Sequence, residues 1–161
     1  DGDATTGINK DTTKWARSPQ IAEFNSKLYT TWYEHDGTAD QIRVAEWDGT
    51  SSWTFVDNDP SGINKDASQG AYNPHITTFD SKLYVTWYEE NGTAQQVRVA
   101  EWDGSNDWSM VDGDGTTGIN KDSSYNAPYP RLAEFDSKLY AVWYESNGSV
   151  YQIRVAEAEM E

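Results

Sequence analysis

Aromatic side chains stand within polar loops of this 161-residue chain and are its strongest candidates for a binding chemistry. Asparagine, aspartate, glutamine and arginine residues flank these rings. An exposed ring stacks on the C–H face of a sugar while polar neighbours bond its hydroxyl groups, so the pattern indicates a carbohydrate site. The alternative is that the rings wedge between packed structural units. The candidate ligand-binding residues are Trp15, Arg17, Tyr72, Asn73, Tyr125 and Tyr129.

Paired aspartates recur two residues apart in short polar loops, as in Asp112-Gly113-Asp114. This spacing resembles calcium loops, which gather oxygen ligands on a kinked backbone. The acid at the twelfth position of an EF-hand is absent, so we expect at most weak calcium binding and no other cofactor. The alternative is an Asx-rich turn in which Asn9, Asn64 and Asn120 cap their own backbone. The candidate metal ligands are Asp1, Asp3, Asp57, Asp59, Asp112 and Asp114.

Recurring glutamates raise the possibility of sugar hydrolysis, which needs two carboxylates in different environments. A catalytic pair is normally unique in a chain, whereas these acids occur once in each copy of a repeat. We therefore interpret the repeated Arg–Glu pairs, whose arginines are Arg43, Arg98 and Arg154, as structural salt bridges between strands or blades and expect no enzymatic activity. The repeated acids of the Trp-Tyr-Glu motif are Glu34, Glu89 and Glu145.

The elements that must position these residues belong to an internal repeat. The segment Gly-Ile-Asn-Lys-Asp occurs three times, about 55 residues apart, and the motifs Lys-Leu-Tyr, Trp-Tyr-Glu and Arg-Val-Ala-Glu return with it. A fixed period of this length is the signature of a repeat architecture. The sequence therefore predicts one module of three units, at residues 7–61, 62–117 and 118–161.

Each unit reads as four short strands separated by turn residues, without a helical period. Asp80-Ser81-Lys82 suits the first turn, and Asn91-Gly92 suits a type I′ hairpin between the second and third strands. Asp103-Gly104 opens the third turn. In the second unit, the strands are expected at residues 74–79, 83–89, 96–102 and 108–111.

The second strand of each unit carries apolar or aromatic side chains on both faces, with Leu83 and Trp87 on one and Tyr84 on the other. Sheets stacked around an axis bury both faces of their inner strands. We therefore predict an all-β fold, a β-propeller with three four-stranded antiparallel blades per chain. An up-and-down barrel is the alternative, although its strands should show a more consistent contrast between inside and outside.

Three blades are too few for a closed ring, since propellers close with about four to eight. We expect a homodimer that closes six blades, because an open fan would expose a large aromatic face at each end. The third unit stops at Glu161 before any tryptophan equivalent to Trp53 or Trp108. It is therefore expected to lack its outer strand.

The net charge of −15, from 12 basic and 27 acidic residues, makes nucleic acid an unfavourable partner. No apolar run approaches the roughly 20 residues of a membrane span, so membrane insertion is not expected. Zero cysteines exclude disulfides and thiolate sites but do not identify a compartment.

Differences among the three copies concentrate in two sets of loops. The connections before each unit's first strand differ, as do the turns between second and third strands, while the strands agree. Alternate connections of a meander lie at one end, so both sets should share one rim. Variation there indicates a binding face; the alternative is that the loop sequences vary freely because packing does not constrain them. The loops are residues 12–18, 67–73 and 123–129, and residues 35–40, 90–95 and 146–151.

The Trp-Asp-Gly hairpins at residues 47–49 and 102–104, each followed by a second tryptophan, resemble blades of fucose-binding propeller lectins and sialidase-like Asp-box hairpins. The whole repeat is similar to uncharacterised propeller repeats of large bacterial surface and secreted proteins. The resemblance implies an extracellular or cell-surface location and a lectin-like function, but Arg43 and Glu46 share one strand, so the lectins' sugar triad is not transferred. We expect non-catalytic glycan binding on the loop rim; the alternative is a purely structural or engineered scaffold without ligand.

Overall fold

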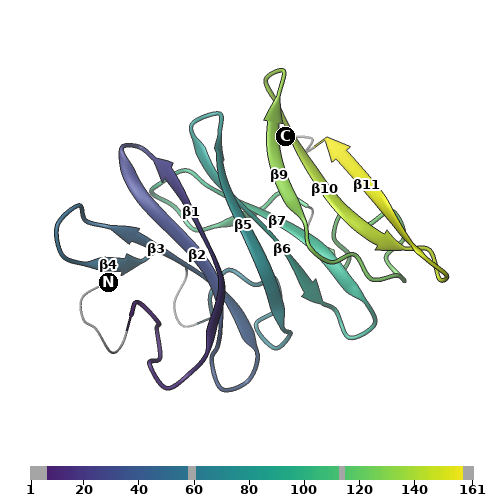
Figure 1. Cartoon of the computed structure of the whole chain (residues 1–161), viewed down its shortest axis with the longest axis horizontal. Helices are drawn as coiled ribbons and strands as arrows, with labels where there is room; N and C mark the ends of the chain where they lie inside the picture. Colours follow the sequence, from purple (N-terminus) through teal and green to yellow (C-terminus); the bar gives the residue numbers. More distant parts are fainter. Residues whose placement is uncertain (1–6, 58–60, 113–114, 158–161) are drawn as a thin grey trace.

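A computed structural model describes residues 7–57, 61–112 and 115–157, and within them the chain forms eleven β-strands. The strands form three antiparallel sheets that lie side by side in chain order (Figure 1). We call them blades 1, 2 and 3. Blade 1 contains β1 (Ala16–Phe24), β2 (Lys27–His35), β3 (Asp40–Trp47) and β4 (Trp53–Phe55); blade 2 contains β5 (Ala71–Phe79), β6 (Lys82–Glu90), β7 (Gln95–Trp102) and β8 (Ser109–Met110); blade 3 contains β9 (Arg131–Phe135), β10 (Lys138–Ser146) and β11 (Tyr151–Glu157).

Each blade is a meander in which neighbouring strands are consecutive in the chain. The first strands β1, β5 and β9 contact one another in turn and form the inner side of the fan. Blades 1 and 2 have four strands, and blade 3 has three within the described residues. The prediction of an all-β fold made of propeller-like blades is confirmed at this level.

The core lies between the blades, because each blade buries apolar side chains against the next. One cluster joins blades 1 and 2 and includes Phe24, Ile76 and Trp102. A second cluster joins blades 2 and 3 and includes Phe79, Leu132 and Trp143. Both faces of β6 are buried, as its alternation of Leu83 and Tyr84 predicts.

Tight turns join the first and second strands of every blade. Phe79 pairs with Lys82, so Asp80 and Ser81 alone form the turn, and both have positive φ angles of 43° and 60°. This is the type I′ geometry that matches the right-handed strand twist. Blades 1 and 3 repeat it with Asn25-Ser26 and Asp136-Ser137.

The type I′ prediction for Asn91-Gly92 is wrong. Glu90 pairs with Gln95, which leaves four residues in the connection, too many for a two-residue hairpin turn. The side-chain oxygen of Asn91 instead accepts hydrogen bonds from the backbone N–H groups of Thr93 and Ala94. The connection is therefore built on an Asx turn.

A bulge interrupts the first strands of blades 1 and 2, where the pairing register shifts between Arg17 and Gln20 and between Tyr72 and His75. The residue before the proline has a positive φ in every blade, 55° at Ser18, for example. Such backbone stores strain and persists where its surroundings hold it. The Ser18 hydroxyl donates to Asn73 Oδ1 at 2.8 Å and joins the bulges of blades 1 and 2.

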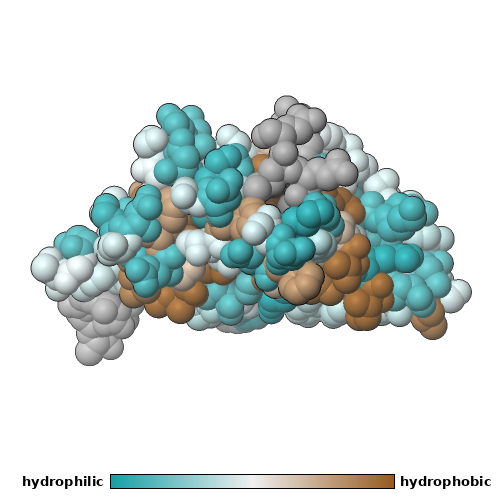
Figure 2. All heavy atoms as spheres, turned by 90° about the horizontal axis from the view of Figure 1, so that it is seen from above, coloured by the Kyte–Doolittle hydropathy of each residue, from teal (hydrophilic) through white to brown (hydrophobic). Residues whose placement is uncertain are grey.

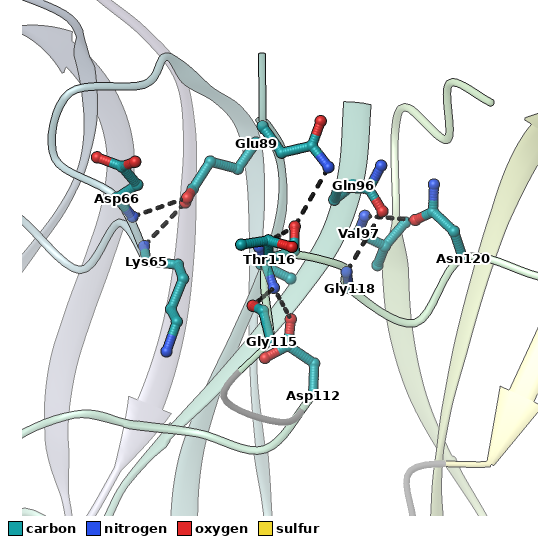
Figure 3. Close-up of polar contacts among 12 residues, drawn as sticks. Lys65, Asp66, Glu89, Gln96, Val97, Asp112, Gly115, Thr116, Gly118 and Asn120 are labelled. Carbon is teal, nitrogen blue, oxygen red and sulfur yellow. Dashed lines mark hydrogen bonds and ion pairs between the residues drawn. The ribbon is translucent and has the colours of Figure 1, made fainter. Parts of the chain in front are cut away.

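The outer edge of β7 is covered by two separate segments. β8 pairs with part of the edge, and the Gly-Ile-Asn segment of the next unit continues along the rest. The Ile119 N–H donates to Val97 O, and Asn120 Oδ1 accepts from the Val97 N–H at 2.8 Å (Figure 3). Asn64 bonds the Ile42 N–H in the same way. These asparagines thus bind a neighbouring strand as well as their own loop. The sequence-based interpretation as backbone caps predicted the contact with the loop and missed the contact with the strand.

Buried glutamates anchor the loop that enters each blade. Glu89 accepts hydrogen bonds from the backbone N–H groups of Lys65 and Asp66 (Figure 3) and from the indole N–H of Trp87. Glu34 and Glu145 make the same contacts in blades 1 and 3. The Trp-Tyr-Glu motif is therefore a structural device that ties a loop to the second strand.

The predicted arginine–glutamate salt bridge is found in blade 3, where Arg154 Nε lies 3.9 Å from Glu145 Oε1, whereas Arg43 and Arg98 lie beside aspartates. Glu46 accepts hydrogen bonds from Lys27 Nζ and the Tyr29 hydroxyl, while Arg43 Nη1 lies 3.6 Å from Asp57 Oδ2. Residues three apart on one strand point to opposite faces, so the arginine and glutamate side chains lie on different sides of the sheet.

Candidate functional site

A hollow of about 410 Å³ opens on the rim between blades 1 and 2. The loop that enters blade 1 and the ends of β2 and β3 form one wall, and β5 contributes the other. Both predicted sets of rim loops therefore meet at this hollow. Its lining residues are Thr13, Lys14, Trp15, Arg17, Tyr33, His35, Asp40 and Tyr72.

Trp15 is the most exposed of the eight tryptophans, with 74% of its surface accessible. The guanidinium carbon of Arg17 lies 4.6 Å from the centre of its ring. A cation over an indole face is favourable and restrains both side chains. Trp15 and Arg17 thus form a flat, ordered edge to the hollow that leaves ring surface open to a ligand.

Tyr72 closes the hollow on the side of blade 2, next to Asp40. Burial and the nearby carboxylates of Asp40 and Glu90 raise the pKa of the Tyr72 hydroxyl to about 12. The hydroxyl therefore stays protonated at neutral pH and keeps its donor. Tyrosine and aspartate together offer a donor and an acceptor to a polar ligand.

Six tyrosines form a continuous ladder across the three blades. Successive ring centroids lie between 5.0 and 5.8 Å apart, the range of favourable aromatic pairs. Because Tyr72 and Tyr129 join rings of neighbouring blades, they have the wedging role that the sequence left as the alternative. The ladder runs through Tyr33, Tyr72, Tyr88, Tyr129, Tyr144 and Tyr151.

The structure brings together three of the six predicted ligand-binding residues, Trp15, Arg17 and Tyr72. Asn73 lies at the inner bulge and accepts from Ser18. Tyr129 belongs to the ladder and is 45% exposed. Tyr125 lies on blade 3, next to Gly148, and its carbonyl oxygen accepts from Asn120. The six therefore do not form one site.

Five residues of the hollow were not among the candidate ligand-binding residues, although all except Tyr33 lie within the predicted rim loops: Thr13, Lys14, Tyr33, His35 and Asp40. Tyr33 belongs to the repeated Trp-Tyr-Glu motif, so its repetition indicated a framework role. His35 and Asp40 bound a variable turn whose blade 2 counterparts are Glu90 and Gln95. The difference between these residues and their blade 2 counterparts was the sequence signal that could have identified them as site residues.

Two of the predicted calcium ligands lie within the described residues, and both face an arginine. Asp57 lies beside Arg43, and Asp112 Oδ2 lies 3.3 Å from Arg98 Nη1. The predicted ligands Asp1, Asp3, Asp59 and Asp114 lie outside the described residues. Across the ranges that are described, no group of three or more His, Cys, Asp or Glu side chains has a geometry that could hold a metal. The two described aspartates act here as structural partners of the arginines.

Replacing Asp112 with asparagine is expected to change how stability depends on pH. Burial raises the pKa of Asp112 to about 6 although Arg98 lowers it. Between pH ~4 and ~6 the folded chain holds a proton on Asp112 that the unfolded chain has released, so the contribution of Asp112 to the free energy of unfolding falls by about 3 kcal/mol as pH rises through this window. Asp112→Asn does not titrate there. Urea unfolding of both proteins at either end of the window should show the difference shifting in favour of the variant; a constant difference would contradict this.

No helix in the described part of the chain has the length and apolar character needed to cross a membrane. Sequence comparison finds no protein-family model and no curated protein that matches the chain.

The fold is similar to those of several glycoside hydrolases with five-bladed β-propellers. A thermostable family-43 glycoside hydrolase matches 91% of the chain at 15% identity, with a TM-score of 0.59. The arabinanase Arb43A of Bacillus subtilis matches 85% at 16% identity, with a TM-score of 0.52. A GH32 beta-fructofuranosidase of Bombyx mori matches 92% at 13% identity, with a TM-score of 0.59. The chain spans 55%, 50% and 35% of these structures, respectively, and at such identities the likeness establishes propeller-like blades and nothing finer.

Proposed function

We propose that the chain is a non-catalytic, lectin-like module that binds carbohydrate in the hollow between blades 1 and 2. The observation that carries this proposal is the exposed indole of Trp15, held by Arg17 at the edge of a hollow of about 410 Å³. The volume lies within the range of small-molecule sites.

Carbohydrate suits this hollow better than a fully apolar ligand. The Trp15 ring offers a flat face for sugar C–H groups, and Asp40, His35 and Lys14 stand around it with acceptors and donors for hydroxyl groups. An aromatic platform with polar groups beside it satisfies both kinds of sugar surface. The similar structures include glycoside hydrolases, which agrees with the proposal but does not carry it.

The roles of the repeated acids support a non-catalytic function. Glu34, Glu89 and Glu145 are buried and accept three hydrogen bonds each from the fold. Their oxygens are thereby engaged and shielded from a substrate. Catalysis on a sugar needs a carboxylate pair that can reach the scissile bond, and these acids do not supply it.

A purely structural or engineered scaffold without ligand is the second candidate. It is favoured by the use of most repeated polar residues in loop anchoring and edge pairing. An extracellular or cell-surface location accompanies both proposals, and so does a homodimer that closes six blades. The first candidate is preferred because packing within the fold leaves 74% of the Trp15 surface exposed, which a purely structural role does not explain.

Replacing Trp15 with alanine is expected to lower glycan affinity at least tenfold, a loss of about 1.4 kcal/mol, while stability stays within ~0.5 kcal/mol. A glycan array would identify the ligand for the parent protein, and calorimetry would compare the variants. Trp53→Ala is the control, because this tryptophan packs against Trp47 on the outer strand away from the hollow. Equal glycan binding by Trp15→Ala and the parent protein would refute the site. An array without any hit would favour the scaffold.

A further inference from the structure

The two ends of the three-blade fan expose apolar residues whose equivalents are buried at the blade interfaces. Ile21 on blade 1 is 63% exposed, whereas its equivalent Ile76 is 5% exposed and packs between blades 1 and 2. Phe135 on blade 3 is 73% exposed, whereas Phe24 and Phe79 are 4% and 8% exposed. Each end therefore has the composition of one half of an interblade interface.

These ends are complementary, because Ile21 and Phe135 occupy opposite sides of the repeat. Ile76 faces the preceding blade in the first core cluster, and Phe79 faces the following blade in the second. Blade 1 thus offers the surface that packs on a preceding blade, and blade 3 offers the surface that receives a following one. Figure 2 shows hydrophobic side chains at the surface on the right, the side where blade 3 lies in Figure 1. The exposed apolar residues of blade 3 include Phe135, Val142, Tyr151, Ile153 and Val155.

The backbone edges are complementary too. Ile63 and Ile119 donate their N–H groups to Ile42 O and Val97 O on the outer edges of β3 and β7. The equivalent edge of β11, at Ile153, has no pairing strand within the described residues, where β11 pairs only with β10. An uncovered edge of this kind is a template for another segment.

The matching segment lies at the other end of the chain. Asn64 and Asn120 each place Oδ1 on a neighbouring strand, whereas Asn9 donates from Nδ2 to Lys14 O within its own loop. Buried Gln41 donates its side-chain N–H to Ala67 O, and the equivalent Gln152 is exposed on β11. Within the described residues, the Gly-Ile-Asn segment of blade 1 and the edge of β11 thus lack the same set of contacts.

We infer that Gly7–Asn9 of a second copy of this chain pairs with the outer edge of β11, with blade 1 of that copy packed on blade 3. By equivalence, the Ile8 N–H donates to Ile153 O, and Asn9 Oδ1 accepts from the Ile153 N–H. Applied twice, this head-to-tail contact completes the six-bladed homodimer proposed above, on which the inference rests.

The inferred contact also reaches the rim. Asn126, the blade 3 equivalent of Trp15, accepts from the Gln95 N–H across the interface of blades 2 and 3. Tyr151 is the blade 3 equivalent of Gln95. In the dimer, Trp15 would therefore stand beside Tyr151 of the second copy and border a composite aromatic hollow.

A glycine substitution isolates the edge contact. A Cβ on Gly62 would lie 2.4 Å from Ile42 O, whereas a Cβ on Gly7 meets nothing nearer than Asn9 Oδ1 at 3.7 Å. Gly7→Ala has room within its own chain but would strike the carbonyl oxygen of Ile153 in the dimer. Gly49→Ala is the control for backbone strain, since Gly49 also has a positive φ, of 85°, and open space around it.

Light scattering after size exclusion at micromolar concentration should give twice 18.2 kDa for the parent protein. Gly7→Ala should raise the dimer dissociation constant at least tenfold, and Gly49→Ala should leave it within twofold. A monomeric or trimeric parent protein would overturn the dimer. A dimeric Gly7→Ala variant would overturn the edge contact.

Charged substitutions test the head-to-tail arrangement. Ile21→Glu and Phe135→Glu change exposed side chains, so each variant should fold and remain monomeric alone. Their mixture should dimerise through one intact interface, because intact blade 3 of the first can receive intact blade 1 of the second while both glutamates lie at the other interface. A mixture that stays monomeric would overturn the arrangement. Glycan binding measured on the same samples separates the two proposals: a dimer without glycan binding contradicts only the function, and a glycan-binding monomer contradicts only the interface.

Discussion

Replacing Glu89 with alanine is expected to lower the free energy of unfolding by about 3–5 kcal/mol. The buried carboxylate accepts from the Lys65 and Asp66 backbone N–H groups and from the Trp87 indole, so the substitution removes the acceptor of three donors. Leaving a buried donor without an acceptor costs about 1–3 kcal/mol. Burial also raises the pKa of Glu89, against the lowering effect of these hydrogen bonds. Urea unfolding followed by tryptophan fluorescence measures the loss.

Two further variants make this test specific. Glu90→Ala changes the exposed neighbouring acid and should alter stability by no more than ~0.5 kcal/mol. Glu89→Gln keeps one acceptor and should fall between the two. A loss below ~1 kcal/mol in Glu89→Ala would mean that the loop finds other acceptors, and the anchoring role would be wrong.

Replacing Gly118 with alanine should cost about 3 kcal/mol, because a Cβ there would overlap the backbone of β7. The added atom would be 1.8 Å from Val97 O and 2.8 Å from Val97 C. The segment would have to move away, and the bonds of Ile119 and Asn120 to the edge of β7 would be lost. Blades 2 and 3 are joined through this segment, so thermal melting should fall as well.

Gly115→Ala is the matched control, three residues earlier in the same connection. Its nearest contact would be Thr117 Oγ1 at 3.6 Å, an ordinary van der Waals distance. We expect a change within ~0.5 kcal/mol. If both alanine variants melt alike, the close approach of Gly118 to Val97 does not hold the blades together.

The candidate site was only partly predictable. Trp15 and Arg17 were recognised because a ring beside a cation in a polar loop has a clear chemistry, whatever the fold. Tyr33 was missed because a residue that recurs in every copy is hard to separate from framework. Asp40 was missed because it faces Tyr72 from the end of β3, across a blade boundary that the linear sequence does not display.

The pairing of polar residues was less predictable still. Asn120 and Val97 are 23 residues apart, and Glu89 and Asp66 are 23 apart as well. Each motif repeats, so the sequence offers each Arg, Asn and Glu several equivalent partners. Only the tertiary structure selects among them, so that Arg43 lies beside Asp57 whereas Arg154 lies beside Glu145.

The sequence by itself determined the repeat, the β-strands and the need to cover both faces of the second strand, because these follow from local alternation and from turn residues at fixed spacing. Tertiary structure alone decided which loops share a hollow, which asparagine reaches which edge and which apolar faces stay open. These features depend on contacts between blades, and a contact between blades joins residues whose separation in the chain carries no local pattern.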